Sequence, residues 1–415
     1  MVRSDVLVLG AGIVGTSIAL HLVKRGRSVT LIDRQAPGEG TSFGNAGVIG
    51  GAGVYPTAFP RRLSSLMRVA LRRSPEANYH WRTLPRFLRW LWAYRTASSP
   101  AQLEVIARAM RPLMAAAVSE HETLMSESDA TRFLRKTGWL SLYRTADGFG
   151  DLAAQFELAA ELGMKSEVLD TEQTLVLEPN LSPIFSKAVM WPEVASVSSP
   201  VGVTRAYAAR FAALGGVFLK ADARSLHRAG ARWRIETAEG AVEGDQAVVA
   251  LGPWTPDLLE PLGIRLPLGV KRGYHRHFRP AGNASLSRPV VDAEVGYVLA
   301  PMEDGIRLTT GAEFALRDAA PTPVQFSRVM PYAKALFPLG EPVEPKPWLG
   351  SRPIFPDSTP VIGRAPGQPD LWLAIGHGHM GLTLGPVTGR LLAEMMTGAT
   401  PFVDPKPYRA ERFLN

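Results

Sequence analysis

Residues 6–33, VLVLGAGIVGTSIALHLVKRGRSVTLID, contain the pattern that decides the fold. Val6–Leu9 is a short apolar run, Ile13–Arg25 carries apolar residues at helical spacing, and Val29–Ile32 is a second apolar run that Asp33 ends. Short apolar runs between turn residues predict buried strands, and a period of 3.6 residues predicts a helix. The stretch therefore predicts a β-α-β unit of about 30 residues, a building block of parallel sheets.

The turn between the first strand and the helix reads Gly10-Ala11-Gly12-Ile13-Val14-Gly15. Gly10 permits the tight turn, Gly12 lets a pyrophosphate approach the backbone, and Gly15 allows close packing of helix and strand. Free N–H groups at the helix N-terminus favour an anion, and Asp33 would accept hydrogen bonds from ribose hydroxyls. This context predicts a dinucleotide site, and the alternative is a glycine-rich turn without a ligand.

The loop that follows distinguishes between nicotinamide and flavin dinucleotides. Residues 41–47, TSFGNAG, offer hydroxyls, small side chains and amides that suit a pyrophosphate and the polar edge of a flavin. A nicotinamide dehydrogenase would have a second ordinary strand–helix unit at this place. The loop therefore favours FAD, and a flexible surface loop is the alternative.

A second glycine-rich turn lies near the C-terminus. A buried strand at 371–375 runs into GHGHMG, residues 376–381, and then into a helix that ends near Met396. Backbone amides at such a helix start can stabilise negative charge on the N1–O2 edge of a reduced flavin. His377 and His379 have i, i+2 spacing and no evident third ligand, which is poor geometry for zinc. No metal site is therefore expected.

The composition limits the possible classes of protein. The length of 415 residues predicts about two domains. The chain has no cysteine, which excludes a disulfide, a thiolate metal site and a flavin attached through a cysteine thioether, so non-covalent FAD is expected. No apolar run reaches the roughly 20 residues of a membrane span, and Asp5 with the recurring glycines argues against a signal peptide. A cytoplasmic protein is expected.

The net charge of +8 is concentrated in residues 61–95, which contain nine arginines and one acid, Glu76. Apolar residues at helical spacing lie there beside tryptophans and arginines: Leu84, Phe87, Leu88 and Leu91, with Trp90, Trp92, Arg82, Arg86 and Arg89. Such a helix either packs on its own domain or lies peripherally on the anionic inner face of a membrane. A nucleic-acid partner is not expected, because the basic residues are not spread over a binding face.

Strand–turn–helix units open and close the chain, and hairpin-like strands lie between them. Strands are expected at 133–143, 217–223, 232–237, 246–251, 270–278, 296–301 and 306–310, and helices near 63–72, 84–95, 101–126, 152–162, 201–214 and 324–336. No single linker divides the chain, so we expect an α/β (α+β overall) protein with interleaved domains. The Rossmann-like FAD-binding domain would comprise 1–50, 195–262 and 346–415, and the antiparallel-sheet substrate domain 51–194 and 263–345.

The glycine-rich turns and further segments resemble the D-amino-acid oxidase superfamily of flavoproteins, which includes glycine oxidase, sarcosine oxidase and bacterial D-amino-acid dehydrogenases. The further segments are Gly350-Ser351-Arg352-Pro353, Pro360-Val361-Ile362-Gly363, Val248–Trp254 and, more weakly, Leu177–Leu181. The resemblance covers nearly the whole chain. TSFGNAG and LPRFLRWLW (84–92) are most similar to the D-amino-acid dehydrogenase branch. GHGHMGLTLGPVTGRLL (376–392) is similar to dehydrogenases of D-proline and hydroxy-D-proline.

The resemblance implies which residues contact FAD. The ADP part would be held by Gly10, Gly12, Ile13, Val14, Gly15, Asp33, Arg34, Ala223, Ala250, Gly252 and Trp254. Ala223 stands at the end of strand 217–223, where the family more often has a valine whose backbone contacts adenine. The flavin would be lined by Thr41, Ser42, Asn45, Ala46 and Gly47, and at its pyrimidine edge by Gly376, Gly378, His379, Met380, Gly381, Leu382 and Thr383.

Three residues are candidates for contact with the substrate. Arg352 matches the family's arginine that clamps the substrate carboxylate, and a planar two-pronged donor is well suited to that task. A surface or ion-pair arginine is the alternative. Tyr274 matches the family's substrate wall, where it would contact the carboxylate or amine or else pack in the core. Tyr55 is a weaker candidate for the pocket.

The resemblance implies hydride transfer from the Cα of an amino acid, such as D-proline or hydroxy-D-proline, to flavin N5. The imine would be hydrolysed to a 2-oxo acid and ammonia, or would remain a pyrroline carboxylate for a cyclic substrate. Several oxygen-using relatives place a lysine above the flavin, and no lysine occurs between Arg272 and Ala333. This absence favours a dehydrogenase that passes electrons to a quinone or another carrier. Two alternatives stay open: an oxidase of sarcosine, glycine or another secondary amine, and a flavin-binding, membrane-associated adaptor without turnover.

Overall fold

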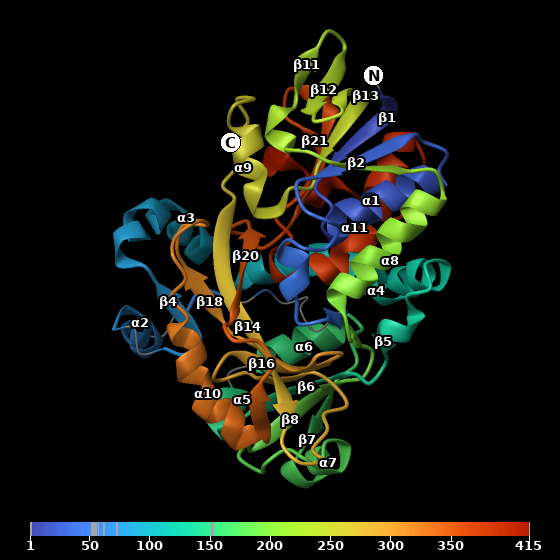
Figure 1. Cartoon of the computed structure of the whole chain (residues 1–415). Coiled ribbons are helices and arrows are strands. Elements are labelled where there is room, and N and C mark those ends of the chain that lie inside the picture. The colour runs from blue at the N-terminus through green and yellow to red at the C-terminus, as the bar shows by residue number, and fades with distance from the viewer. Residues whose placement is uncertain are drawn as a thin grey trace.

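The computed structural model describes residues 2–50, 56, 58–60, 63–71, 74–150 and 153–414. Within them, the strands form a mainly parallel first sheet, a mainly antiparallel second sheet and a small third sheet. Figure 1 shows the first sheet with its helices in the upper half of the view and the second sheet in the lower half. The expected mixed α/β architecture is confirmed.

The first sheet has the strand order β10-β2-β1-β13-β12-β11, with β22 beside β13 and β21 beside β22. Its strands are β1 (Val2–Leu9), β2 (Val29–Asp33), β10 (Val217–Lys220), β11 (His227–Ala229), β12 (Arg232–Thr237), β13 (Gly240–Val249), β21 (Val361–Ala365) and β22 (Gln368–Ile375). The central strands β10, β2, β1, β13 and β22 run parallel. With α1 at Ile13–Lys24, the β-α-β unit predicted from residues 6–33 is confirmed.

Each face of the first sheet has its own apolar core, because successive side chains of a strand point to opposite faces. Val6 and Val8 belong to the core on the face covered by helices, whereas Leu7 and Leu9 belong to the core on the other face. The helical face carries α1, α4 (Pro100–Glu127), α8 (Pro200–Ala213) and α11 (Gly381–Thr397), which contact one another. The carboxyl ends of the parallel strands therefore meet at one edge of this layer.

The second sheet has the strand order β4-β18-β14-β17-β16-β15-β6-β8-β7, with β19 and β20 also paired to β14. Its strands are β4 (Ala77–Tyr79), β6 (Trp139–Tyr143), β7 (Glu167–Leu169), β8 (Lys187–Trp191), β14 (Gly269–Pro280), β15 (Val290–Asp292), β16 (Tyr297–Met302), β17 (Gly305–Thr309), β18 (Ala312–Phe314), β19 (Leu339–Pro342) and β20 (Trp348–Ile354). The third sheet joins β3 (Val48–Ile49), β9 (Ala195–Val197) and β5 (Leu134–Arg135). The long strand β14 is the centre of the second sheet.

The short helix α9 (Thr255–Leu259) packs in the second core of the first sheet. The remaining helices lie around the second sheet: α2 (Leu63–Ala70), α3 (Leu84–Ala97), α5 (Ala146–Gly150), α6 (Ala153–Glu161), α7 (Thr171–Leu177) and α10 (Val324–Leu336). Figure 1 shows α2 and α3 together on the left of the view, next to β4 and β18. Among the described residues, no helix combines the length and the apolar character that crossing a membrane requires.

The structure corrects three details of the sequence analysis. The expected strand 133–143 is two strands in different sheets, β5 and β6, separated by the turn at Gly138. The expected strand 217–223 ends at Lys220, and Ala223 begins a short 3-10 helix. The part of 346–415 that forms β20 pairs with β14 in the second sheet, so the last FAD-domain segment would begin after Ile354.

Candidate active site

A first cavity of about 130 Å³ lies at the carboxyl ends of β1, β2 and β13. The predicted cofactor residues that line it are Gly10, Gly12, Ile13, Val14, Asp33, Arg34, Thr41, Ser42, Asn45, Ala223, Ala250, Gly252, Trp254, Gly376, Gly378, Gly381 and Leu382. Segments from four distant parts of the chain thus meet at one place, as expected for the ADP part of a dinucleotide.

The geometry around Gly10 explains the glycine-rich turn. Its φ is +107°, and a Cβ atom there would lie 2.4 Å from the carbonyl oxygen of Ala250. The backbone N–H of Ala11 donates to the Asp33 carboxylate at 2.7 Å, and that of Ile13 donates to Ser42 Oγ at 2.9 Å. The N-terminus of α1 lines this cavity with Gly12, Ile13 and Val14, and the positive end of the helix dipole there suits a pyrophosphate.

Aromatic and cationic groups form the outer end of the first cavity. The guanidinium of Arg34 lies 4.6 Å from the centre of the Trp254 ring. Asp222 and Arg224, which flank Ala223, line the same end. The strand before Ala223 ends earlier than expected, but Ala223 lines the first cavity, and its backbone contact with adenine stays a prediction.

A second cavity of about 590 Å³ continues from the first, because Thr41, Asn45, His377 and Gly378 line both. It reaches the second sheet, and its walls include the predicted flavin residues Ala46, His379, Met380 and Thr383 and the predicted substrate residue Arg352. Gly15 and Gly47 line neither cavity. Gly15 has a packing role instead, since a Cβ atom there would lie 1.8 Å from the carbonyl oxygen of Gly10.

The two cavities together fit FAD. The narrow part has backbone amides, an acidic side chain and an aromatic ring where a nucleotide requires them, and the wide part begins at the N-terminal end of α11. Near that end, Asn45 Nδ2 donates to the carbonyl oxygen of His379 at 3.1 Å, which joins the predicted flavin loop to the C-terminal turn. The residues that the sequence placed around the flavin are thus brought together.

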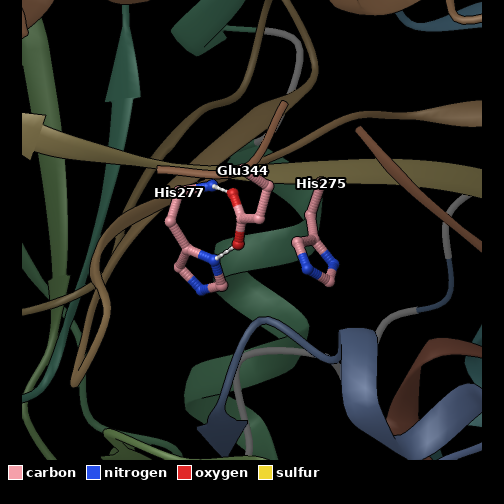
Figure 2. Close-up of side chains that lie close together, drawn as sticks. All are labelled: His275, His277 and Glu344. Carbon is pink, nitrogen blue, oxygen red and sulfur yellow. Dashed lines mark hydrogen bonds and ion pairs between the residues drawn. The ribbon is translucent and has the colours of Figure 1, made fainter. Parts of the chain in front are cut away.

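A buried network fixes the loop 41–47 to the second sheet. Arg307 on β17 donates to the carbonyl oxygens of Phe43, at 3.1 Å, and Asn45. Arg307 Nε also donates to Nε2 of His277 at 2.9 Å, and Nδ1 of His277 donates to Glu344, as Figure 2 shows for the last pair. A charged residue inside an apolar strand, Arg307, was the one local signal that could have indicated this network.

His275, His277 and Glu344 bring their ligand atoms within 4.8 Å of one another, a spacing that a metal ion could use. Figure 2 shows Glu344 contacting both the backbone and the ring of His277. Both ring nitrogens of His277 have partners, and one of these partners is the guanidinium of Arg307. A fixed cation beside the cluster opposes metal binding, and the same Arg307 connects the cluster to Phe43 and Asn45 in the loop 41–47.

Arg352 on β20 is a half-buried cation without an acid partner among the described residues. Its guanidinium donates only to the carbonyl oxygens of Gly311, at 2.9 Å, and Thr310, at 3.1 Å. Burial alone lowers the pKa of Arg352 to about 10, and no carboxylate raises it. A desolvated guanidinium that faces a cavity without a counter-ion is a strong site for an anionic ligand.

Gly273 on β14 makes room for this guanidinium. A Cβ atom at Gly273 would lie 2.3 Å from the Nη2 atom of Arg352. The two strands are directly paired, so Arg352 lies across the backbone of Gly273 on the face that lines the cavity. The position of the Arg352 guanidinium thus depends on the absence of a side chain at Gly273 on the neighbouring strand.

Replacing Gly273 by alanine is expected to displace the guanidinium and lower kcat/KM for the substrate about 10²-fold, because small displacements of a positioning group have effects of that size. FAD content should not change. Gly150→Ala is the matched control, since a Cβ atom there meets nothing within 4 Å. Steady-state kinetics of the two variants would test this, and equal activities would contradict the role of Gly273.

The structure does not support a substrate contact for the hydroxyl of Tyr274. The residue is buried, and its hydroxyl donates to Glu313 at 3.0 Å and accepts from the backbone N–H of Thr322 at 2.7 Å. Tyr274 nevertheless lines the second cavity, so its place in the substrate wall stays a prediction, while its hydroxyl completes an ion-pair network with Glu313 and Arg272. Tyr55 lies outside the described residues.

Sequence reasoning missed Lys271, which lies on β14 and lines the second cavity. Lys271 immediately precedes the range in which the absence of a lysine favoured a dehydrogenase. That absence therefore does not separate an oxidase from a dehydrogenase. A charged pair in a predicted strand, Lys271-Arg272, was the only signal that could have indicated it.

Comparison with known proteins agrees with this geometry. The chain is 29% identical over 417 residues to a D-amino-acid oxidase of Bradyrhizobium diazoefficiens, with 99% of each chain covered. It is 32% identical to a D-amino acid dehydrogenase of a Methylobacterium species, with 98% of this chain and 99% of the relative covered. The crystal structure of glycine oxidase from Geobacillus kaustophilus has the same fold, with a TM-score of 0.75 at 22% identity and 99% of each chain covered.

Residues 5–395 match the D-amino-acid oxidase (DAO) family, described as FAD dependent oxidoreductase. This match covers most of the chain, including both glycine-rich turns and Arg352. The protein belongs to this family and is an FAD-dependent oxidoreductase that acts on amino acids.

Proposed function

We propose that the protein is a dehydrogenase of D-amino acids, with D-proline or hydroxy-D-proline as the substrate. The observation that carries the proposal is Arg352, a half-buried cation that lines the second cavity and has no acid partner among the described residues. An amino-acid carboxylate supplies the missing charge and accepts two parallel hydrogen bonds. Relatives named D-amino acid dehydrogenase support the chirality.

FAD, when bound, supplies the two-electron oxidant for the Cα–H bond. The chain's own residues orient the substrate: Arg352 holds the carboxylate, and the strands β14, β17 and β20 form the wall behind it. The network of Arg307, His277 and Glu344 holds the loop 41–47 against that wall. Catalysis would rest mainly on this orientation, which converts a bimolecular step into one within a fixed complex.

The rest of the second cavity favours an apolar substrate side chain. The walls away from Arg352 are mainly apolar and aromatic, with Trp139, Tyr143, Phe156, Leu158, Leu162, Met164 and Trp191. A pyrrolidine ring suits such a wall, since burying its methylene groups contributes about 0.8 kcal/mol each. The similarity of residues 376–392 to dehydrogenases of D-proline and hydroxy-D-proline points to the same substrates.

The electron acceptor in this proposal is a quinone or another carrier. The alternative is a sarcosine- or glycine-type oxidase that uses oxygen, and relatives with both kinds of name occur. Screening D-proline, hydroxy-D-proline, D-alanine and sarcosine with an artificial acceptor, and then with air, would test the proposal. Rapid turnover in air, or turnover of sarcosine alone, would favour the alternative. A bound flavin that no amine reduces would favour an adaptor without turnover.

A contact with the inner face of the membrane would bring the enzyme close to a quinone. The buried face of α3 is formed by Phe87, Trp90 and Tyr94, whereas Leu88, part of the expected apolar stripe, is 58% exposed. Trp92, one turn further on the outer face, is 70% exposed. Exposed arginines flank this face: Arg82, Arg86, Arg89 and Arg95. Exposed tryptophan with arginine matches the chemistry of an anionic lipid surface.

The protein is expected to float with vesicles that contain anionic lipid and to be released by salt. In the double variant Arg86→Ser/Arg89→Ser, the partition coefficient should fall at least about tenfold, because each arginine near such a surface contributes about 1 kcal/mol. Val176→Ser, which changes an exposed apolar residue on α7, is the control. Wild-type protein that stays in solution with these vesicles would contradict the membrane contact.

A further inference from the structure

Lys271 faces the same part of the cavity as Arg352. The two residues are direct cross-strand partners on β14 and β20, and both line the second cavity. Side chains of such partners start about 5 Å apart on the same face of a sheet. Gly273 follows two residues after Lys271 on that face, and the Arg352 guanidinium lies over its backbone. The amine of Lys271 therefore belongs to the immediate surroundings of the carboxylate clamp.

The surroundings of the Lys271 amine are apolar and aromatic. Its Nζ lies 4.0 Å from the centre of the Tyr94 ring, 5.5 Å from that of Trp90 and 5.7 Å from that of Phe314. Burial lowers the pKa of Lys271 to about 7, and the charge of Arg352 acts in the same direction. Among the described residues no carboxylate counteracts these effects. Both effects favour the neutral amine of Lys271 over its ammonium form.

An amino acid reaches the site as a zwitterion, and its ammonium group must lose a proton before the Cα–H bond can be oxidised. The reason is electronic, since the C=N bond of the imine forms from the lone pair on nitrogen. With the carboxylate on Arg352, the nitrogen is bonded to the adjacent Cα atom and so lies within a few bonds of the clamp. A base for this proton must face the cavity beside Arg352, as Lys271 does.

We propose that Lys271 accepts the proton that the substrate's ammonium group loses before oxidation. The substrate N–H bond breaks, an N–H bond forms on Lys271 Nζ, and the electron pair stays on the substrate nitrogen. No atom changes its oxidation state in this step, and the proton later leaves to solvent. The inference rests on the proposed oxidation of an amino acid and adds a named base to it.

The binding order favours this transfer. Before the substrate arrives, the charge of Arg352 opposes protonation of Lys271. When the carboxylate binds, it compensates that charge, so the affinity of Lys271 for a proton rises at the moment the ammonium group is present.

The other titratable groups of the cavity are poorer bases. Burial and the charges of Arg352 and Lys271 lower the pKa of His379 to about 4. Glu76 also lines the cavity, and burial raises the pKa of its carboxyl, but a carboxylate remains a weaker base than an amine. Burial raises the pKa of the Tyr94 phenol, which keeps its proton. A neutral lysine is the strongest base among these groups.

Binding of a second substrate carboxylate is a different role that a lysine could have. The faces of three aromatic rings surround Lys271 Nζ, and ring faces carry the negative part of the aromatic quadrupole. They favour the lysine cation after proton transfer and repel an anion. The surroundings thus suit a group that alternates between amine and ammonium.

The test compares wild-type holoenzyme with Lys271→Met and Lys271→Arg. In the wild type, kcat/KM should rise as pH increases through about 7, because the neutral amine is the active form. In both variants kcat/KM should fall about 10²-fold near neutral pH. It should recover at alkaline pH, where the substrate amine loses its proton to water. Lys271→Arg keeps a positive charge that cannot titrate, so an unchanged pH profile in that variant would overturn the proposal.

A second measurement, which needs no turnover, distinguishes Lys271 as a base from Lys271 as a second carboxylate site. Propionate and glutarate are titrated into each holoenzyme, and binding is followed by the change in visible absorption. Both affinities should be nearly unchanged in Lys271→Met, and FAD content and thermal midpoint should match those of the wild type. A selective loss of glutarate binding would show that Lys271 forms a second carboxylate site, and would overturn its role as the base. If the wild type oxidises no amino acid, the proposed function fails, whereas turnover with unaltered profiles in both variants refutes only the lysine role.

Discussion

Replacing Arg352 by methionine is expected to lower kcat/KM for the amino acid about 10²–10⁴-fold without loss of FAD. A charged hydrogen bond to a buried group contributes about 1.5–3 kcal/mol, and the clamp would make two. Steady-state kinetics with an artificial electron acceptor would measure the loss. The kcat/KM of Arg352→Lys should lie between those of the wild type and Arg352→Met, because an ammonium supplies the charge but not the planar fork.

Arg352→Met should leave the thermal midpoint of the ligand-free protein unchanged or raise it. Arg352 is a half-buried charge without an acid partner among the described residues, and desolvation lowers its pKa, so removing the charge relieves a desolvation cost. Loss of activity without loss of stability is the signature of a binding residue. Arg364→Met on β21, where the side chain is exposed, is the control. A wild-type KM in Arg352→Met would contradict the clamp.

Replacing Glu313 by alanine is expected to destabilise the protein by about 3–5 kcal/mol, because it leaves the guanidinium of Arg272 buried without its partner. Both side chains are fully buried, and Arg272 Nη2 lies 2.6 Å from Glu313 Oε2. Glu313 also accepts hydrogen bonds from Tyr274, Asn78 and Thr322. The substitution therefore leaves several buried polar groups without an acceptor. Chemical denaturation would measure the change.

Two further variants test the physical reason for this loss. Combining Glu313→Leu with Arg272→Met removes both charges and should restore the part of the loss that comes from the unpaired guanidinium. The part that comes from Tyr274, Asn78 and Thr322 should remain, because these groups still lack their acceptor. Glu193→Ala removes an exposed partner of Lys165 and should change stability very little. If Glu313→Ala were no more harmful than Glu193→Ala, the network behind Tyr274 would not support the cavity wall.

The parts of the site that local sequence determines were predictable. Residues 6–33 form the expected β-α-β unit because glycines and apolar runs at this spacing have few other low-energy arrangements. The turn at residues 376–381 precedes α11 as expected. These segments carry about half of the predicted cofactor residues, and all of those except Gly15 line one of the two cavities.

Sheet register and side-chain direction were not predictable, because they depend on partners far away in the chain. Lys271 meets Arg352 only through the pairing of β14 with β20, and nothing local indicates that pairing. The buried face of α3 differs from the expected one for a similar reason. The expected stripe included Leu88, but the aromatic cluster with Ile354 and Phe314 buries Trp90 and Tyr94 instead. Tyr274 was placed on the correct strand, but its hydroxyl bonds to Glu313.

The central claim is that this chain holds FAD and uses Arg352 to present an amino acid to it. The most direct test is the visible absorption spectrum of the purified protein, recorded without oxygen before and after D-proline, hydroxy-D-proline or D-alanine is added. We expect a flavin band that one of these substrates bleaches in the wild type, but far more slowly in Arg352→Met. A protein without a flavin band, or a band that no amino acid bleaches, would contradict the account.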